Sequence, residues 1–245
     1  MKRETQNILL ILLGGALVKI AANGDYLRYV KPAQQPWIIV GGGVMVLLGA
    51  VAILRDLRAA RTAGAAPDRQ HGAGDGHAHS TRPAWLLLVP VLAVFLIAPP
   101  ALGADSVIRT EARVPASAAA ANSAAFPALP AGNVVPLPVN EFVSRAGWDT
   151  AGTLNGRTVS LTGFVVHTGG STLLARLVIS CCAADAFPVT VRLRGGEADH
   201  LASDAWIQVT GQVVPGTATR DNSYTPDFTP ASVTTIPAPK DPYEY

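Results

Sequence analysis

The sequence predicts a protein in two parts: an α-helical membrane part at the N-terminus and a small all-β, OB-like barrel at the C-terminus. Three windows in the first 104 residues are nearly free of charged side chains, which is typical of membrane helices. After residue 139 the apolar residues instead alternate with polar ones over short runs, as in half-buried strands. Hydrophobic residues make up 49% of the chain and aromatic residues only 6%, so Ala, Val and Leu supply most of the apolar content.

The three apolar windows are predicted to be membrane helices at residues 5–22, 37–54 and 84–102. Each is close to the roughly 20 residues that a bilayer core requires. Lys19 can extend its side chain to the interface, and Trp37 opens the second window where interfacial tryptophan is enriched. Gly43 and Gly49 are expected to face another helix, because small residues let backbones approach closely; the alternative is that glycine is merely tolerated there.

The loop at 55–83 sets the predicted orientation. Positive charge in short loops beside membrane helices marks the cytoplasmic side, and this loop carries Arg55, Arg58, Arg61, Arg69 and Arg82. We therefore expect a multi-pass cell-membrane protein with a cytoplasmic N-terminus and an extracytoplasmic C-terminal domain. Two processing alternatives stay open: a secretory signal in place of the first helix, and cleavage near Gly103, after a small-x-small run.

Residues 105–138 are rich in Ala, Pro and Ser without periodicity and are predicted to be a semi-rigid linker. The C-terminal domain is placed at 139–245 and is expected to open with a short helix at 141–146. Gly163 and Gly211 suit bends in strands. With these bends, the pattern favours an OB-like fold over another small barrel or a sandwich, with strands at 158–166, 173–179, 189–194, 206–214 and 231–236.

Charge is distributed unevenly between the two parts. From residue 139 onward the chain has seven Lys and Arg against ten Asp and Glu, a formal charge of −3, whereas the whole chain carries +2. A nucleic-acid surface needs a basic stripe to neutralise phosphates. Nucleic acid is therefore not expected as a partner, although OB-like folds often bind it.

The two cysteines of the chain, Cys181 and Cys182, stand side by side between two apolar runs, and Asp185 follows three residues later. Two thiolates and a carboxylate are suitable zinc ligands if the chain turns at this point, and the intervening alanines permit a turn. His167, at the end of the first predicted strand, is the candidate fourth ligand. We therefore predict a metal site formed by Cys181, Cys182, Asp185 and His167.

Three alternatives use the cysteines differently. They can pack in the core as small apolar side chains. They can form a vicinal disulfide, which is strained because adjacent Cα atoms lie about 3.8 Å apart whereas disulfides prefer roughly 4.4–6.8 Å. A catalytic thiol needs a base, and nothing in the sequence ties His167 or His200 to either cysteine. We therefore predict no enzymatic activity.

A second, weaker metal-binding stretch is predicted in the loop between the second and third apolar windows. It contains His71, His77 and His79 in a glycine-rich, flexible sequence, and His-rich tracts can gather metal ions. A solvated polar loop is the alternative. The predicted topology places this loop on the opposite side of the membrane from Cys181, so the two stretches cannot form one site.

Several stretches of the chain resemble the YcgQ-like family of bacterial membrane proteins: ARLVISCCAADAFPVTV, NGRTVSLTGFVV, DAWIQVTGQVV, the closing PKDPYEY, and NGDYLRYVKP between the first two apolar windows. The resemblance implies a membrane-anchored OB-like domain, association with a permease and a link to zinc supply. It brings no enzymatic activity with it. It covers most of the chain outside the 55–83 loop and the linker.

Residues and resemblance together predict a membrane-anchored accessory subunit of a permease. The subunit itself is expected to handle a metal ion such as zinc. The expected partners are the permease and the lipid bilayer, and the expected cofactor is zinc or none. Two other roles remain open: a non-catalytic docking subunit whose cysteines pack in the core, and a thiol-redox protein.

Overall fold

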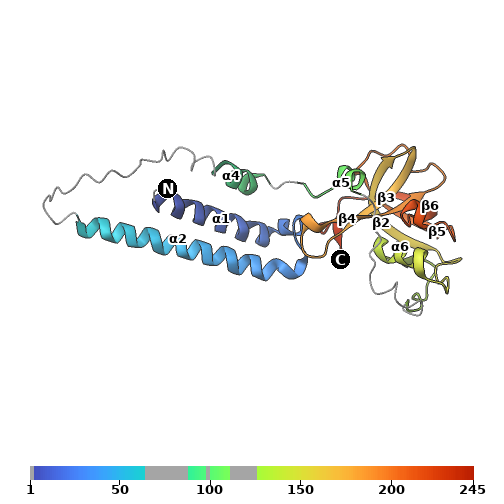
Figure 1. The fold of residues 1–245 in the computed structure, drawn as a ribbon, viewed down its shortest axis with the longest axis horizontal. Helices are drawn as coiled ribbons and strands as arrows, with labels where there is room; N and C mark the ends of the chain where they lie inside the picture. Colours follow the sequence, from blue (N-terminus) through green and yellow to red (C-terminus); the bar gives the residue numbers. More distant parts are fainter. Residues whose placement is uncertain (1–2, 64–87, 98–99, 111–125) are drawn as a thin grey trace. The chain divides into compact units, whose positions relative to one another are not determined.

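The computed structural model describes residues 3–63, 88–97, 100–110 and 126–245 (Figure 1). The chain divides into two compact units, each described by itself. The helical unit comprises Met1–Tyr26 and Pro32–Pro100, and the C-terminal unit comprises Leu27–Lys31 and Ala101–Tyr245. The short segment Leu27–Lys31, which lies in the chain between two apolar helices, thus belongs to the C-terminal unit.

Two long helices dominate the helical unit: α1 (Arg3–Asn23) and α2 (Gln35–Ala63). Their apolar stretches, Gln6–Asn23 and Pro32–Ala59, are long and apolar enough to cross a membrane, with mean hydropathies of 1.5 and 2.5. A signal sequence near the N-terminus meets the same criterion. Short 3-10 turns lie in the chain between the two helices, at Asp25–Arg28 and Pro32–Gln34.

Glycines set the contact between α1 and α2. A Cβ added at Gly14 would lie 2.6 Å from the carbonyl oxygen of Gly42, and one added at Gly42 would lie 2.8 Å from that of Gly14. Gly49 likewise lies against Ile11. The predicted helix contact is therefore confirmed at Gly49, but it uses Gly42 in place of Gly43, which has nothing within 4 Å of its added Cβ.

The third apolar window is described only in part. Its central portion forms α4 (Leu88–Leu96), whereas residues 84–87 and 98–99 lie outside the described residues. Nine helical residues are fewer than a membrane crossing requires, so a third membrane helix stays a prediction.

The C-terminal unit is built on a mixed sheet with the strand order β1-β2-β5-β6-β4-β3-β7 and a further pairing of β2 with β3, which partly closes the strands into a ring (Figure 1). All five predicted strands are present, and the predicted short helix is α6 (Val139–Trp148). The strands are β1 (Val135–Pro136), β2 (Val159–Thr168), β3 (Ser171–Val178), β4 (Phe187–Leu193), β5 (Trp206–Val213), β6 (Asp227–Thr235) and β7 (Tyr243–Glu244).

The ring depends on a change of partner along β2. Its first half pairs with β5 and its second half with β3, and both pairings reach Phe164. Gly163 precedes this point, and a Cβ there would lie 2.6 Å from the carbonyl oxygen of Ala175. The predicted bend at Gly163 thus coincides with the close approach of two strands, which only glycine allows.

The interior of the ring is an apolar cluster that α6 joins through Phe142, whose ring meets Phe228 edge-to-face at 5.6 Å between centroids. A second cluster on other residues of β2 and β3 is covered by α5 (Ala104–Arg109) and Tyr243. Successive side chains of a strand point to opposite faces, so β2 and β3 contribute to both clusters.

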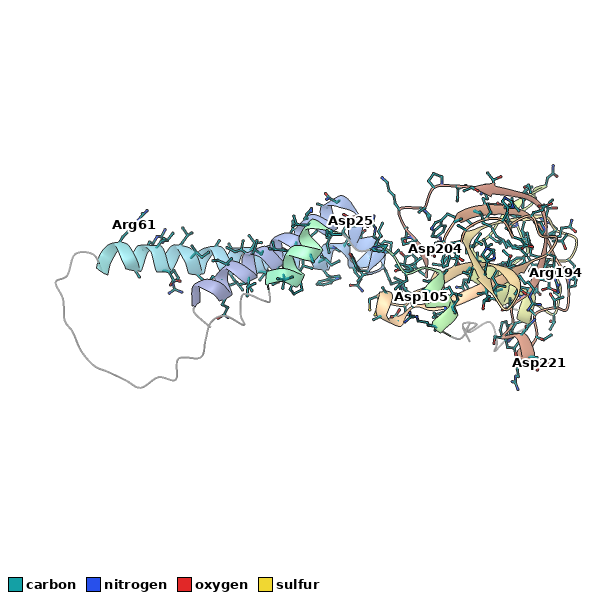
Figure 2. All side chains as sticks on the ribbon, turned by 90° about the horizontal axis from the view of Figure 1, so that it is seen from above. Asp25, Arg61, Asp105, Arg194, Asp204 and Asp221 are labelled. Carbon is teal, nitrogen blue, oxygen red and sulfur yellow. The ribbon has the colours of Figure 1, made fainter. Side chains whose placement is uncertain are left out.

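Helix α5 lies where a linker was expected. Its backbone begins at Ala104, whose N–H donates to Asp204 Oδ1 at 2.6 Å, and its buried Ala104 and Val107 pack on the sheet. Asp204 and Asp105 can be located in Figure 2. Further along, β1 pairs with the start of β2. The described ends of the 105–138 stretch therefore take part in the C-terminal unit, and residues 111–125 between them lie outside the described residues.

Candidate functional site

The two cysteines lie on a turn between β3 and β4 that one carboxylate organises. Asp185 stands at the end of a 3-10 turn, Ala183–Asp185, and accepts backbone N–H groups from the three residues before that turn. Oδ1 accepts from Ser180 at 2.8 Å, and Oδ2 accepts from Cys181 at 2.8 Å and from Cys182 at 3.5 Å. The carboxylate thereby folds the chain around itself, which is a local role typical of aspartate.

This turn brings the sulfur atoms together on the protein surface. The Sγ atoms of Cys181 and Cys182 are 3.7 Å apart, and both belong to free thiols. Cys181 is exposed and Cys182 is half-buried. The interpretation of the cysteines as packed core side chains is therefore wrong, because neither cysteine is buried.

A ligand atom from each of Cys181, Cys182 and Asp185 lies within 4.8 Å of the other two. Within the described part of the chain, this is the one group of three or more His, Cys, Asp and Glu side chains close enough to share an ion. Three of the four predicted ligands are thus brought together.

The carboxylate and the first thiol also shift each other's protonation. A hydrogen bond to Asp185 is the main cause that raises the pKa of Cys181 to about 11, with the neighbouring Cys182 thiol adding to it. The same hydrogen bond lowers the pKa of Asp185. In the metal-free state the Cys181 thiol is therefore protonated at neutral pH, which disfavours a nucleophilic role because the thiolate is the reactive form.

The segment Leu27–Lys31 pairs with this turn. Val30 and Cys182 form an isolated antiparallel bridge. The N–H of Ala183 donates to the carbonyl of Tyr29 at 2.7 Å, and the N–H of Lys31 donates to the carbonyl of Cys181 at 3.4 Å. The turn is thus held on one side by Asp185 and on the other by this segment.

His167 is not part of this group. Its Nε2 lies 2.7 Å from the carbonyl oxygen of Leu201, and its Nδ1 lies 3.2 Å from the hydroxyl of Thr172, which donates to Asp199. His167 pairs with Thr172 at the hairpin end of β3, whereas the cysteines follow the other end. The strand rises by six residue steps from Thr172 to Val178, about 20 Å at 3.3 Å per step, so the structure does not bring His167 to the thiols.

Comparison with known proteins adds one finding. Residues 149–245, which contain β2 to β7 and the double cysteine, match a family model. The model is that of the DUF1980 C-terminal domain. The match covers less than half of the chain, and no curated protein and no solved structure matches. The YcgQ-like resemblance and the permease association stay predictions.

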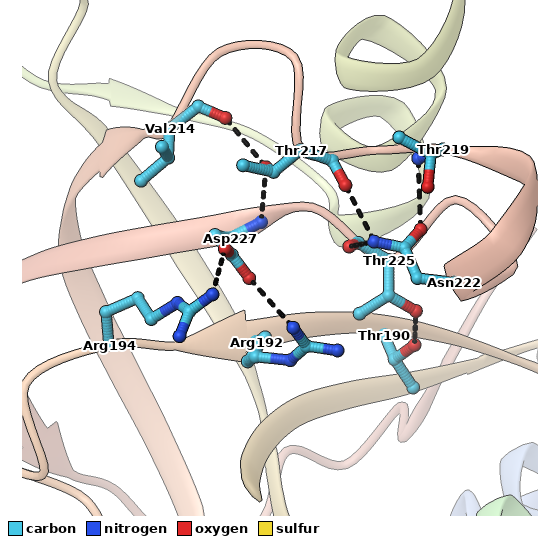
Figure 3. A network of polar contacts seen from close by, with 9 residues as sticks. All are labelled: Thr190, Arg192, Arg194, Val214, Thr217, Thr219, Asn222, Thr225 and Asp227. Atoms are coloured by element: carbon cyan, nitrogen blue, oxygen red, sulfur yellow. Dashed lines mark hydrogen bonds and ion pairs between the residues drawn. The ribbon is translucent and has the colours of Figure 1, made fainter.

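The DUF1980 C-terminal domain contains a buried polar network that the sequence analysis missed (Figure 3). Asp227 is 7% exposed at its side chain and forms ion pairs with Arg192 and Arg194. Its backbone N–H donates to the hydroxyl of Thr217 at 2.8 Å, and Thr217 in turn donates to the carbonyl of Val214 at 2.7 Å.

The same network continues around Asn222. Its amide nitrogen donates to the carbonyls of Thr217 and Thr225, and its amide oxygen accepts from Thr219 (Figure 3). The network joins the loop after β5 to strands β4 and β6. Its hydrogen bonds and ion pairs fix the loop and the two strands to one another, so we assign the network to stability.

The closing residues of the domain form a second structural cluster. Both oxygens of Glu244 accept backbone N–H groups at the start of α6, from Val139 at 2.9 Å and Asn140 at 2.7 Å. Glu244 also lies 3.4 Å from the buried guanidinium of Arg176, whose pKa is lowered by burial. The C-terminal strand is therefore fixed by charge as well as by pairing.

The predicted histidine stretch is the remaining candidate. His71, His77 and His79 lie outside the described residues, so a weak metal-binding loop there stays a prediction.

Proposed function

We propose that the protein binds a zinc ion at Cys181 and Cys182, with Asp185 as an additional oxygen ligand, and serves as a membrane-anchored accessory subunit of a permease. In this proposal the C-terminal domain is OB-like, extracytoplasmic and non-enzymatic. The fourth coordination position is open, which suits receipt or delivery of an ion.

The observation that carries this proposal is the distance of 3.7 Å between the two Sγ atoms. Zinc bonds thiolate sulfur at about 2.3 Å, and two such bonds at a tetrahedral angle place the sulfurs about 3.8 Å apart. The turn thus holds two soft ligands at the spacing of a tetrahedral edge. A metal in linear two-coordinate geometry would require the sulfurs on opposite sides of the ion.

The state of Asp185 fits a third, weaker ligand. An ionised carboxylate offers about four lone-pair sites, and three backbone N–H groups already occupy part of this capacity. Zinc binding also requires both thiols in the thiolate form. Asp185 therefore has two roles in the proposal: it shapes the turn, and it contributes one remaining oxygen site.

The membrane part of the proposal rests on α1 and α2, which are long and apolar enough to cross a bilayer. The arginines at 55–83 favour a cytoplasmic position for that loop. The permease partner rests on the sequence resemblance alone. A docking subunit without metal and a thiol-redox protein are the competing roles.

The test measures zinc per chain in the full-length protein, purified in detergent under reducing conditions. We expect about one zinc per chain, and loss of most of it in Cys181→Ser and in Cys182→Ser. His200→Gln is the matched control, because His200 is exposed, can ligate zinc in principle and belongs to neither the turn nor the network.

Absence of zinc from the unmodified chain, or equal zinc in both cysteine variants and the control, contradicts the proposal. Thiol counting before and after reductant then separates the competitors. Two titratable thiols without metal favour the docking subunit, and thiols that appear only after reduction favour a redox role.

A further inference from the structure

The turn at residues 180–185, called the dithiol turn because it contains Cys181 and Cys182, has a second set of contacts. The proposed zinc site does not explain their role. Asp185 takes the N–H groups of Ser180, Cys181 and Cys182. The segment Leu27–Lys31 takes two other groups, the carbonyl of Cys181 and the N–H of Ala183. Together they hold the backbone on both sides of Cys182.

These contacts bear directly on the spacing of the thiols. In a regular extended chain, neighbouring side chains point to opposite faces, and Cys182 itself is extended, with φ −153° and ψ 168°. The sulfurs are nevertheless 3.7 Å apart. The spacing therefore depends on the rotation of the peptides that flank Cys182, and the segment binds two groups of these peptides.

The segment is held in place from its far side as well. The hydroxyl of Tyr243 donates to the carbonyl of Arg28 at 3.0 Å and accepts the N–H of Leu102 at 3.2 Å. The ammonium of Lys31 lies 5.8 Å from the centre of the Tyr245 ring. Tyr243 of β7 and the following Tyr245 thus hold the segment on the side away from the turn.

We propose that Leu27–Lys31 is the positioning element of the dithiol turn, and that docking of this segment and zinc binding at Cys181 and Cys182 strengthen each other. The inference rests on the proposed function. Zinc binds the turned form that the docked segment maintains, so the docked segment raises zinc affinity. By thermodynamic reciprocity, bound zinc raises the stability of the docked segment by the same factor.

Replacement of one backbone donor tests the first half of this coupling. Lys31→Pro removes the N–H that binds the carbonyl of Cys181, whereas Lys31→Ala keeps it and removes only the side chain. In the full chain in detergent, we expect Lys31→Pro to weaken zinc binding about tenfold, the equivalent of one hydrogen bond. Lys31→Ala loses only the contact of its ammonium with the Tyr245 ring and should weaken zinc binding by at most about twofold.

Amide hydrogen exchange of the unmodified chain tests the second half and requires no variant to fold. Zinc should slow exchange at Lys31 and Ala183, while exchange in β5, whose strand partners are β2 and β6, serves as the internal control. Tyr243→Phe removes the far-side anchor and should reduce the protection at Lys31.

The outcomes separate this inference from the proposed function. If zinc binds but exchange at Lys31 and Ala183 is unchanged, or if the proline and alanine variants bind it equally, the coupling is contradicted while the zinc site stands. If the unmodified chain binds no zinc, both are contradicted.

Discussion

Asp227 and Asp185 are both carboxylates of the C-terminal domain, but one is buried in a structural network and the other organises an exposed turn. Asp227 is buried, and its negative charge is compensated within the domain by ion pairs with Arg192 and Arg194. Asp185 lies in an exposed turn and binds backbone N–H groups, and the neighbouring thiols are exposed at Cys181 and half-buried at Cys182. A buried network of paired charges holds a fold together, whereas a carboxylate that shapes an open turn leaves nearby side chains available as ligands. We therefore assign Asp227 to the stability of the domain and Asp185 to the candidate metal site.

The largest effect is expected at the buried carboxylate. Asp227→Ala should lower the free energy of unfolding of the domain by about 3 kcal/mol, since it leaves Arg192 and Arg194 without their carboxylate partner. Denaturant unfolding followed by tryptophan fluorescence measures this. Zinc content under native conditions should not change, and a large loss of zinc at unchanged stability would contradict the assignment.

The next effect is expected at the C-terminal strand. Glu244→Gln should cost about 2 kcal/mol, because the neutral amide is a weaker acceptor at the start of α6 and leaves Arg176 less well compensated. The same unfolding experiment measures it. Arg220→Gln, at an exposed residue of the 3-10 turn Arg220–Asn222, is the control and should stay within about 0.5 kcal/mol.

A smaller stability effect and a larger chemical effect are expected at Asp185. Asp185→Asn should cost about 1 kcal/mol, as for loss of an exposed cap. In the metal-free protein it should lower the pKa of Cys181 from about 11 toward its ordinary value, because the variant lacks the carboxylate that accepts the hydrogen bond of the thiol and holds its proton.

Alkylation of Cys181 against pH measures that shift. In the unmodified chain the rate should rise with pH toward a midpoint near 11, and in Asp185→Asn the midpoint should fall, so that alkylation at pH 8 is faster. An equal or slower rate in the variant would show that Asp185 does not hold the Cys181 proton.

The regular elements could be predicted because each has a local signal. The apolar windows gave the two long helices, and period-two alternation gave all five main strands. In contrast, β1, β7 and α5 were missed: each is at most six residues long and depends on distant partners. Asp204 holds the start of α5, and Glu244 joins β7 to α6. Local sequence patterns do not predict contacts between residues that are far apart in the chain.

The candidate site likewise contains residues that local sequence could bring together and contacts that depend on distant parts of the chain. Cys181, Cys182 and Asp185 lie within five residues, so turn chemistry alone could bring them together. The position of His167 depends instead on the hairpin register of β2 and β3, which places it at the opposite end of β3 from the cysteines. The contact of Val30 with Cys182 joins residues far apart in the chain, and sequence patterns contain no information about it.

X-ray absorption at the zinc edge of the zinc-loaded full chain tests the central claim most directly. The account predicts two sulfur ligands at about 2.3 Å, with the remaining ligands oxygen or nitrogen at about 2.0–2.2 Å. It also predicts loss of one sulfur in Cys181→Ser. A first shell that contains only oxygen and nitrogen would contradict the dithiol site.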